Sequence, residues 1–355
     1  MTAPAISTHF EDSRSRGPVT LGLALQGGGS YGAFTAGVVK ALMKNSAFRN
    51  GDIQIIGISG TSAGAKNGTL ITDGLKNGGP DQVIENLDKY WAEIGSHGRA
   101  LELMPHLTFW ARYPNLPQIL VDYSKLFATL GSVAPQNYLL NLIDRSVTNW
   151  ETLNKGDPKL FTNAIEIDQK SGKKSHVIFK EHCPETVVAS ANLPEFGPLE
   201  FRGHHYYDGA AGHNPSICPL EELEGLTDIM VVNLHKRPDS FYEATHQDDI
   251  RVIEKMAEDE FITHHVTAHL NHISENPEKE YHLHEIALEP DISWDKTSRM
   301  NTMPSWINQL MKMGERAGNE WIRQHIKDLG QRSSYTATLA QEEMANTRHL
   351  EAAIA

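Results

Sequence analysis

Apolar residues alternate with small or polar residues in several short segments, a pattern typical of buried β-strands. In the first segment, Val19, Leu21, Leu23 and Leu25 alternate with smaller side chains. Residues 53–58 are rich in isoleucine and predict a second buried strand. Further strand candidates are residues 160–167, 175–179, 227–234 and 282–288.

Helical spacing of apolar residues follows the first strand, where Phe34, Val38 and Leu42 share one face. A second helix is expected just past Ser62. Residues 80–158 and 247–275 also favour helices, as does a C-terminal segment expected to end at Gly330. Strands that alternate with helices predict an α/β fold, with three layers and a mainly parallel central sheet.

The chain of 355 residues divides into three expected parts. Residues 1–18 are polar and lack periodicity, which predicts a disordered leader. Residues 19–290 form the expected main α/β domain, in which residues 80–158 are a helical insertion. Residues 291–355 are expected to form a C-terminal helical extension packed on that domain.

Charge and composition argue against one class of partner and indicate a compartment. The formal net charge is −13 and no run of Lys or Arg stands out, so nucleic acid is not an expected partner. Cys183 and Cys218 make no disulfide framework and indicate a reducing compartment. The first residues show no apolar signal region and no stretch is long enough for a membrane span, so we expect a cytoplasmic protein.

Ser62 stands in Gly60-Thr-Ser-Ala-Gly64, between a predicted strand and a predicted helix. Gly-x-Ser-x-Gly in this position predicts a strained turn that lifts the serine hydroxyl away from the backbone. The amide of Ala63 and the positive end of the helix would face a developing oxyanion. Because the pattern also arises by chance in glycine-rich chains, its place after a strand carries the inference. Ser62 is the candidate nucleophile.

The glycine-rich segment Gly27-Gly-Gly-Ser-Tyr-Gly32 allows two interpretations. It matches a dinucleotide fingerprint, but that interpretation needs an acidic residue at the end of the second strand, where this chain has Ile-Ser-Gly. The other interpretation is a row of backbone amides, from Gly28, Gly29 and Ser30, that receives an oxyanion. No nucleotide, metal or other cofactor is therefore expected.

Two bases are candidates for activating the serine. Asp208 follows an aromatic strand and precedes Gly209 and Ala210, although Asp-Gly is also a common turn. His235 closes a predicted strand and would give the order Ser, Asp, His of an α/β-hydrolase triad. Three further histidines share a helical face without an accompanying HExxH motif, which favours a structural role over metal binding: His265, His269 and His272.

The combined motifs resemble the bacterial branch of the patatin-like phospholipase family. GGGSYG (27–32), GTSAG (60–64) and DGA (208–210) occur in the order typical of that family. The stretch from Ala189 to the DGA, with His-Asn-Pro after it, is similar too. The resemblance covers about residues 19–330. It departs at Tyr31, where many members have Arg or Lys.

The resemblance implies a Ser62–Asp208 dyad without histidine. It also implies an oxyanion loop of Gly27, Gly28, Gly29 and Ser30, supported by Gly32, Gly60, Gly64, Gly209 and Ala210. The implied reaction is cleavage of a carboxylic ester of a phospholipid, lysophospholipid or acylglycerol at a lipid surface, through an acyl-enzyme. The apolar insertion at 80–158 would be a wall or lid of the acyl pocket, or simply core of the helical layer. A Ser-His-Asp esterase and a catalytically silent lipid-binding protein stay open as alternatives, and the oligomeric state is not predicted.

Overall fold

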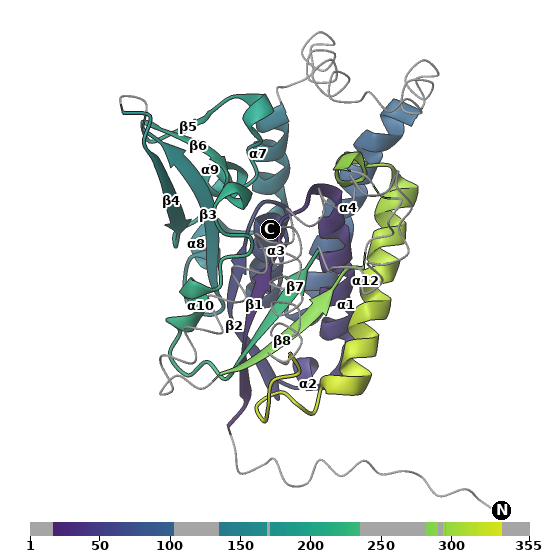
Figure 1. Ribbon diagram of the computed structural model, residues 1–355. Coiled ribbons are helices and arrows are strands. Elements are labelled where there is room, and N and C mark those ends of the chain that lie inside the picture. The colour runs from purple at the N-terminus through teal and green to yellow at the C-terminus, as the bar shows by residue number, and fades with distance from the viewer. Residues whose placement is uncertain are drawn as a thin grey trace, which may run out of the picture.

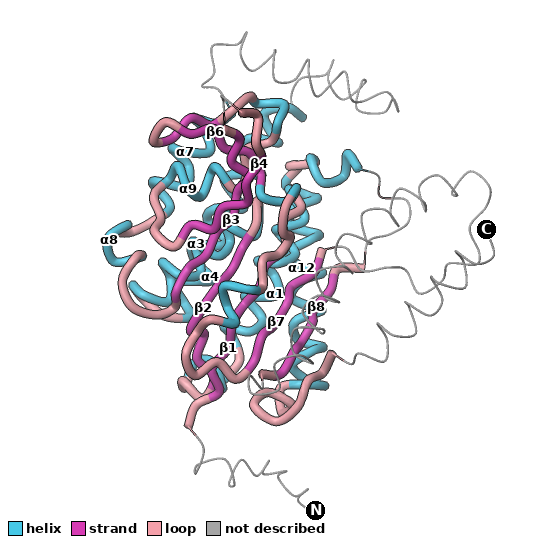
Figure 2. Tube along the Cα trace, turned by 60° about the vertical axis from the view of Figure 1, so that its left-hand side comes forward, coloured by secondary structure: helices cyan, strands magenta, loops and turns pink. Residues whose placement is uncertain are grey.

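A computed structural model of the chain describes residues 17–102, 135–168, 171–234, 281–289, 294 and 296–335. At its centre lies an eight-stranded sheet with the order β5-β6-β3-β2-β1-β7-β8, in which β4 also pairs with β3. Figure 2 shows β3, β2, β1, β7 and β8 side by side across the molecule. These five strands are parallel: β1 (Val19–Leu25), β2 (Ile53–Gly60), β3 (Lys159–Ile167), β7 (Asp228–Asn233) and β8 (His282–Ala287).

An antiparallel region extends one edge of the sheet. β6 (His204–Asp208) and β4 (Lys174–Phe179) both pair antiparallel with β3, and β5 (Leu199–Phe201) pairs antiparallel with β6. β6 follows the Arg202–Gly203 turn, in which both residues have positive φ angles. This tight turn returns the chain so that Asp208 ends beside Ala164 of β3.

Helices flank the sheet. On one face, Leu21, Leu23 and Leu25 of β1 join a core with residues of α1, α3, α4 and α12, and Figure 1 shows α1 beside α12. On the other face, Ala24 and Ile229 pack with Leu220 of the short helix α10. The helices are α1 (Gly32–Lys44), α2 (Ser46–Arg49), α3 (Ala63–Asn77), α4 (Pro80–Glu102), α7 (Pro135–Ser146), α8 (Trp150–Leu153), α9 (Pro184–Ala189), α10 (Cys218–Glu221) and α12 (Pro304–His325).

The predicted fold class is confirmed, since a mostly parallel sheet is flanked by helices. The predicted strands are all present, and the short strand β5 had no recognisable pattern of its own. The helical segment 247–275 and most of the expected leader lie outside the described residues, and the domain boundaries stay a prediction. In the part of the chain that is described, no helix is both long and apolar enough to cross a bilayer.

The expected helix end at Gly330 is wrong. α12 ends at His325, and turns follow in which Asp328 N–H donates to the His325 carbonyl. Gly330 has a φ of 69°, and its amide donates to the Asp228 carboxylate at 2.9 Å. Gly330 therefore marks the end of the turns that follow α12, and the helix itself ends earlier.

Buried polar side chains connect the turns after α12 to strands β7 and β8. His284 Nε2 lies 2.8 Å from Asp228 Oδ1, and both side chains are fully buried. His284 Nδ1 lies 2.9 Å from the Ser334 hydroxyl. Asp228 begins β7 and His284 lies in the first half of β8, whereas Ser62 follows the far end of the parallel strand β2. This Ser-His-Asp arrangement therefore belongs to the anchoring of the turns after α12.

We predict that α1 and α12 tolerate no added side-chain atom at their crossing. A Cβ on Gly314 would lie 2.0 Å from the Phe34 carbonyl oxygen. Gly314→Ala should therefore lower the free energy of unfolding by about 1–3 kcal/mol, because the helices must separate. Urea denaturation measures the change.

Gly95→Ala is the matched control in a helix interior, since its nearest neighbour would lie 3.5 Å away. This substitution should change stability by less than about 1 kcal/mol, in the stabilising direction. Equal stability of the Gly314→Ala and wild-type proteins would contradict the close helix contact.

Candidate active site

Ser62 lies in a strained turn between β2 and α3. Its φ and ψ angles are 53° and −116°, a conformation that L-residues rarely adopt. Gly64 N–H donates to the Thr61 carbonyl at 2.7 Å, and Ser62 N–H donates to the Ser190 hydroxyl at 3.0 Å. These bonds hold the turn that the Gly-x-Ser-x-Gly pattern predicts.

The glycines of the pattern are required by close backbone packing. A Cβ on Gly60 would lie 2.3 Å from the Gly64 carbonyl oxygen. A Cβ on Gly64 would lie 2.1 Å from the Leu25 carbonyl oxygen. Both distances are far below contact, so any side chain there would force β1, β2 and α3 apart.

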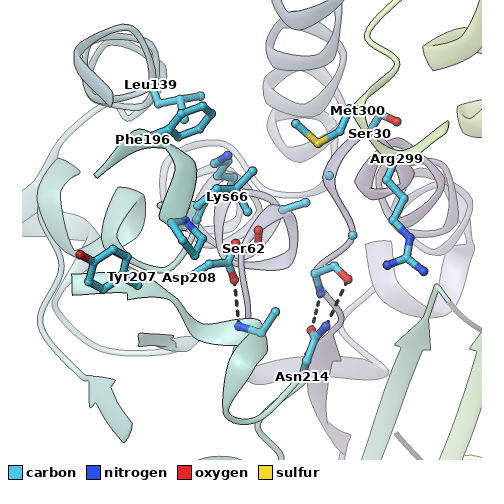
Figure 3. Close-up of a pocket in the computed structure, with 18 of the residues that line it drawn as sticks. Ser30, Ser62, Lys66, Leu139, Phe196, Tyr207, Asp208, Asn214, Arg299 and Met300 are labelled. Atoms are coloured by element: carbon cyan, nitrogen blue, oxygen red, sulfur yellow. Dashed lines mark hydrogen bonds between the residues drawn. The ribbon is translucent and has the colours of Figure 1, made fainter. Parts of the chain in front are cut away.

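Asp208 ends β6 and lies beside Ser62 (Figure 3). Its Oδ1 accepts a hydrogen bond from Ala210 N–H at 2.8 Å, so the carboxylate caps a short 3₁₀ helix, Gly209–Ala211. A hydrogen-bond interaction with the Ser62 hydroxyl favours the charged carboxylate. The two residues proposed as a dyad are thus neighbours, although they come from distant parts of the sequence.

Ser190 and Asn163 connect the two halves of this pair. Ser190 accepts from Ser62 N–H, and its carbonyl accepts from Gly209 N–H at 3.2 Å. Asn163 Oδ1 accepts from the Thr61 hydroxyl at 2.6 Å, and its amide group donates to the His213 carbonyl at 2.8 Å. Both side chains are almost fully buried. The relative position of nucleophile turn and aspartate loop is therefore fixed by buried polar contacts.

The glycine-rich loop passes next to the nucleophile turn. A Cβ on Gly27 would lie 2.8 Å from Ser62 Cβ. Gly27 N–H donates to Asn214 Oδ1 at 2.7 Å, as Figure 3 shows, so this amide is already engaged. Gly27 therefore contributes its position in the loop and not its amide, and the set of oxyanion donors stays a prediction. In the described residues the amides of Gly28 and Ala63 donate to no protein acceptor, and they stay candidates together with Gly29 and Ser30.

The Ser30 side chain has a structural partner. Its hydroxyl donates to the Ser298 carbonyl at 3.0 Å and accepts from Trp306 Nε1 at 3.2 Å. Gly29 has a φ of 58°, and a Cβ there would lie 2.3 Å from the Arg299 carbonyl oxygen. The loop is therefore clamped between the nucleophile turn and the segment that leads into α12. Gly32 begins α1 behind it, in contact with Ala63 and Trp91.

A pocket of about 840 Å³ lies at this site. Ser62, Asp208 and residues 27–30 form one part of its wall. Most of the remaining wall is apolar: Tyr90, Trp91, Ile94, Leu139, Ile165, Ile167, Ala191, Leu193, Pro194, Phe196 and Met300. Tyr90, Trp91, Ile94 and Leu139 belong to the segment expected as the helical insertion. The volume is in the range of pockets that enclose a small organic ligand.

Opposing effects act on the two buried charges of the site. Burial raises the pKa of Asp208, while its contacts with Ser62, Ala210 N–H and the Lys66 charge lower the pKa. Burial lowers the pKa of Lys66 to about 8, although the Asp208 charge raises it. Lys66 lies one helical turn after Ser62 in α3 and lines the pocket. Among the described residues, no three His, Cys, Asp or Glu side chains converge as a metal site would require.

A family model described as patatin-like phospholipase matches residues 23–223. The chain belongs to this family. Its three motifs, at residues 27–32, 60–64 and 208–210, all lie within the matched part and meet at the pocket described above. The family resemblance inferred from the sequence is thereby confirmed. No curated protein matches the sequence.

Solved structures resemble this patatin-like chain more distantly. The type III effector ExoU is 15% identical, with a TM-score of 0.37, over 86% of this chain and 53% of the ExoU chain. VipD from Legionella pneumophila is 15% identical, with a TM-score of 0.29, over 84% of this chain and 67% of the VipD chain. ExoU in its complex with SpcU from Pseudomonas aeruginosa is 16% identical, with a TM-score of 0.36, over 88% of this chain and 52% of the ExoU chain. The chain thus spans about half the length of ExoU.

Three residues of the patatin-like site had no role in the sequence interpretation. Lys66 follows the nucleophile motif at helical spacing, which was a usable signal. Ser190 and Asn214 stand in the stretches around the DGA motif, but only the folded chain shows which atoms they contact. His235 and the histidines at 265, 269 and 272 lie outside the described residues.

We predict that Ser190 positions Ser62. Ser190→Ala removes the acceptor of the Ser62 amide, which leaves a buried donor without a partner and loosens the turn. Labelling of Ser62 by a fluorophosphonate should slow about tenfold, a value that corresponds to one lost buried hydrogen bond. Mass spectrometry of the labelled peptide gives the rate.

Ser96→Ala is the control, because the Ser96 hydroxyl is exposed on α4 and bonds only its own helix, at the Glu93 carbonyl. Its labelling rate should equal that of the wild type. An unchanged rate in Ser190→Ala would show that the Ser190 contact does not support the nucleophile.

Proposed function

We propose that this protein is a serine lipid acyl hydrolase that cleaves carboxylic esters of phospholipids, lysophospholipids or acylglycerols. One observation carries the proposal: a serine in a strained turn, a buried carboxylate beside it and a glycine loop with unengaged amides line the same apolar pocket. Membership of the patatin-like phospholipase family supports a lipid ester as substrate. The apolar wall suits an acyl chain.

Acylation begins with attack of the Ser62 hydroxyl on the ester carbonyl carbon, and its proton moves to Asp208. Oδ1 of Asp208 already accepts from Ala210, but a carboxylate offers a second oxygen for the proton. The negative oxygen of the tetrahedral intermediate would accept from the amides of Gly28, Gly29, Ser30 and Ala63. The alcohol then leaves with the proton from Asp208, and the acyl group stays on Ser62.

Deacylation repeats these steps with water. Asp208 takes a proton from the water molecule as it attacks the acyl-enzyme, and the fatty acid leaves as Ser62 recovers its proton. Burial suits Asp208 to this role, because a raised pKa brings a carboxyl group closer to the proton affinity that a base at neutral pH requires. Contact with a lipid surface from the outside fits a chain whose described helices include no membrane span.

The dyad is tested by two separate substitutions. Ser62→Ala removes the nucleophile and Asp208→Asn removes the base, so each should reduce hydrolysis of p-nitrophenyl butyrate at least about a thousandfold. Circular dichroism and melting curves establish that each variant is folded. Full activity in either folded variant would refute the dyad.

The pH dependence of kcat/KM should reflect the protonation of the Asp208 carboxylate. Because the acceptor of the proton is the charged carboxylate, kcat/KM should fall at low pH, about tenfold for each pH unit below the pKa. Burial raises that pKa, so we expect the acid limb above the ordinary value of 3.8. kcat/KM of p-nitrophenyl butyrate, measured over the pH range in which the fold is intact, gives the limb.

His235→Ala is the companion variant for this measurement. The dyad predicts that it keeps both the limb and the rate in the chemical step. If folded His235→Ala loses both its activity and the acid limb, the base is a histidine.

A further inference from the structure

The pocket has the opposite charge balance from the rest of the molecule. The chain carries a formal net charge of −13. The charged residues that line the pocket are nevertheless three cations and one carboxylate: Lys66, Lys174, Arg299 and Asp208. The Arg299 guanidinium packs over the Tyr31 ring, so the positive charge that can attract an anionic ligand into the pocket rests mainly on the lysines.

Lys66 is the cation closest to the reacting groups in the sequence and the most enclosed. It lies in α3, four residues after Ser62, and lines the same pocket as Tyr90, Trp91 and Ile94 of α4. Its only electrostatic partner is the charge of Asp208, and in the described part of the chain its ammonium makes no hydrogen bond or salt bridge. An enclosed ammonium without a hydrogen-bond acceptor is costly to a folded protein.

Other partly buried lysines of the same layer are fully paired. Lys76, at the far end of α3, donates to the carbonyls of Leu153 and Lys155 at 2.6 and 2.7 Å. Lys40 of α1 contacts Asp88 and Glu315 at 2.7 and 3.0 Å. The fold therefore supplies acceptors where a lysine is structural, and it leaves Lys66 with donors that face the cavity.

We propose that Lys66 forms a subsite for the phosphate group of an amphiphilic ligand, next to the ester that Ser62 attacks. This inference rests on the proposed function only for the position of the ester. Binding of the phosphate is independent of catalysis. Lys66 is then a specificity-determining residue, which favours esters with a phosphate near the acyl chain over neutral esters of the same chain length.

Binding without turnover tests the subsite. In the Ser62→Ala protein at neutral pH, octyl phosphate should bind about tenfold or more tightly than 1-octanol, because a charge-assisted hydrogen bond is added to the same apolar chain. Isothermal titration calorimetry measures both affinities. Lys66→Met in the same background keeps the side-chain length, removes the charge and should abolish the preference. Lys66→Arg should retain most of it.

A pH series adds a signature that a purely structural lysine would not give. The preference for octyl phosphate should decline when the pH is raised well above 8, because burial lowers the pKa of Lys66 to about 8. In Lys66→Arg the preference should persist at that pH, since a guanidinium stays charged.

Two controls define the ligand. Lys89→Met changes an exposed lysine of α4 that pairs with Glu85 at 2.6 Å, so both affinities should stay as they are. Inorganic phosphate at millimolar concentration should not displace octyl phosphate, because the alkyl chain is part of the ligand. Complete displacement would identify a free-phosphate site and overturn the assignment to an amphiphile.

The subsite and the hydrolase can fail separately. Equal binding of octyl phosphate and 1-octanol, or a preference that survives in folded Lys66→Met, overturns the subsite whatever the activity. A wild-type protein that prefers octyl phosphate but cleaves no ester overturns the hydrolase and leaves the subsite in place.

Discussion

The turn at Ser62 is the constraint on which the rest of the site depends. A positive φ at a non-glycine residue persists only if surrounding contacts fix it, and here three parts of the chain do so. The backbone of β1 packs against Gly64, the glycine-rich loop packs against Ser62 Cβ, and Ser190 accepts the Ser62 amide. The aspartate loop is in turn bonded to Ser190 through Gly209. One strained residue is thus linked to the position of Asp208 and of the glycine-rich loop.

Burial shifts the pKa values of two charged groups in the pocket, Asp208 and Lys66. It favours the neutral state of Asp208 and so raises the pKa of this carboxyl, while the hydrogen bond from Ala210 N–H favours the charged state. Burial likewise favours the neutral form of Lys66, and for an ammonium this means a lowered pKa. The two groups line the same pocket, and the charge of each one shifts the pKa of the other. Tyr31, which replaces the basic residue of many family members, instead packs against Trp294 and Trp306.

Local patterns predicted the parts of this protein that local physics determines. The strands, the helix after each glycine turn and the strained serine follow from residue types over a few positions. Asp208 was a less certain candidate until the family resemblance was considered, because an Asp-Gly pair alone also fits a turn. The partners of Ser190, Asn163 and Asn214 could not be predicted, since each contact joins residues that are far apart in the sequence. The engaged amide of Gly27 was missed for the same reason. Gly330 showed that a correct stop signal can still misplace a helix end by several residues.

The clamp on the glycine-rich loop has a consequence for biosynthesis. This loop is among the first parts of the site to leave the ribosome, yet Ser30 is held by Ser298 and Trp306, and Gly29 packs on the Arg299 backbone. During translation, Ser62 and Asp208 are therefore made some time before the glycine-rich loop can form all its contacts. In a nascent chain, the glycine-rich loop gains these contacts only after the segment before α12 has emerged and docked. The order of synthesis itself thus delays completion of the pocket until most of the protein is made.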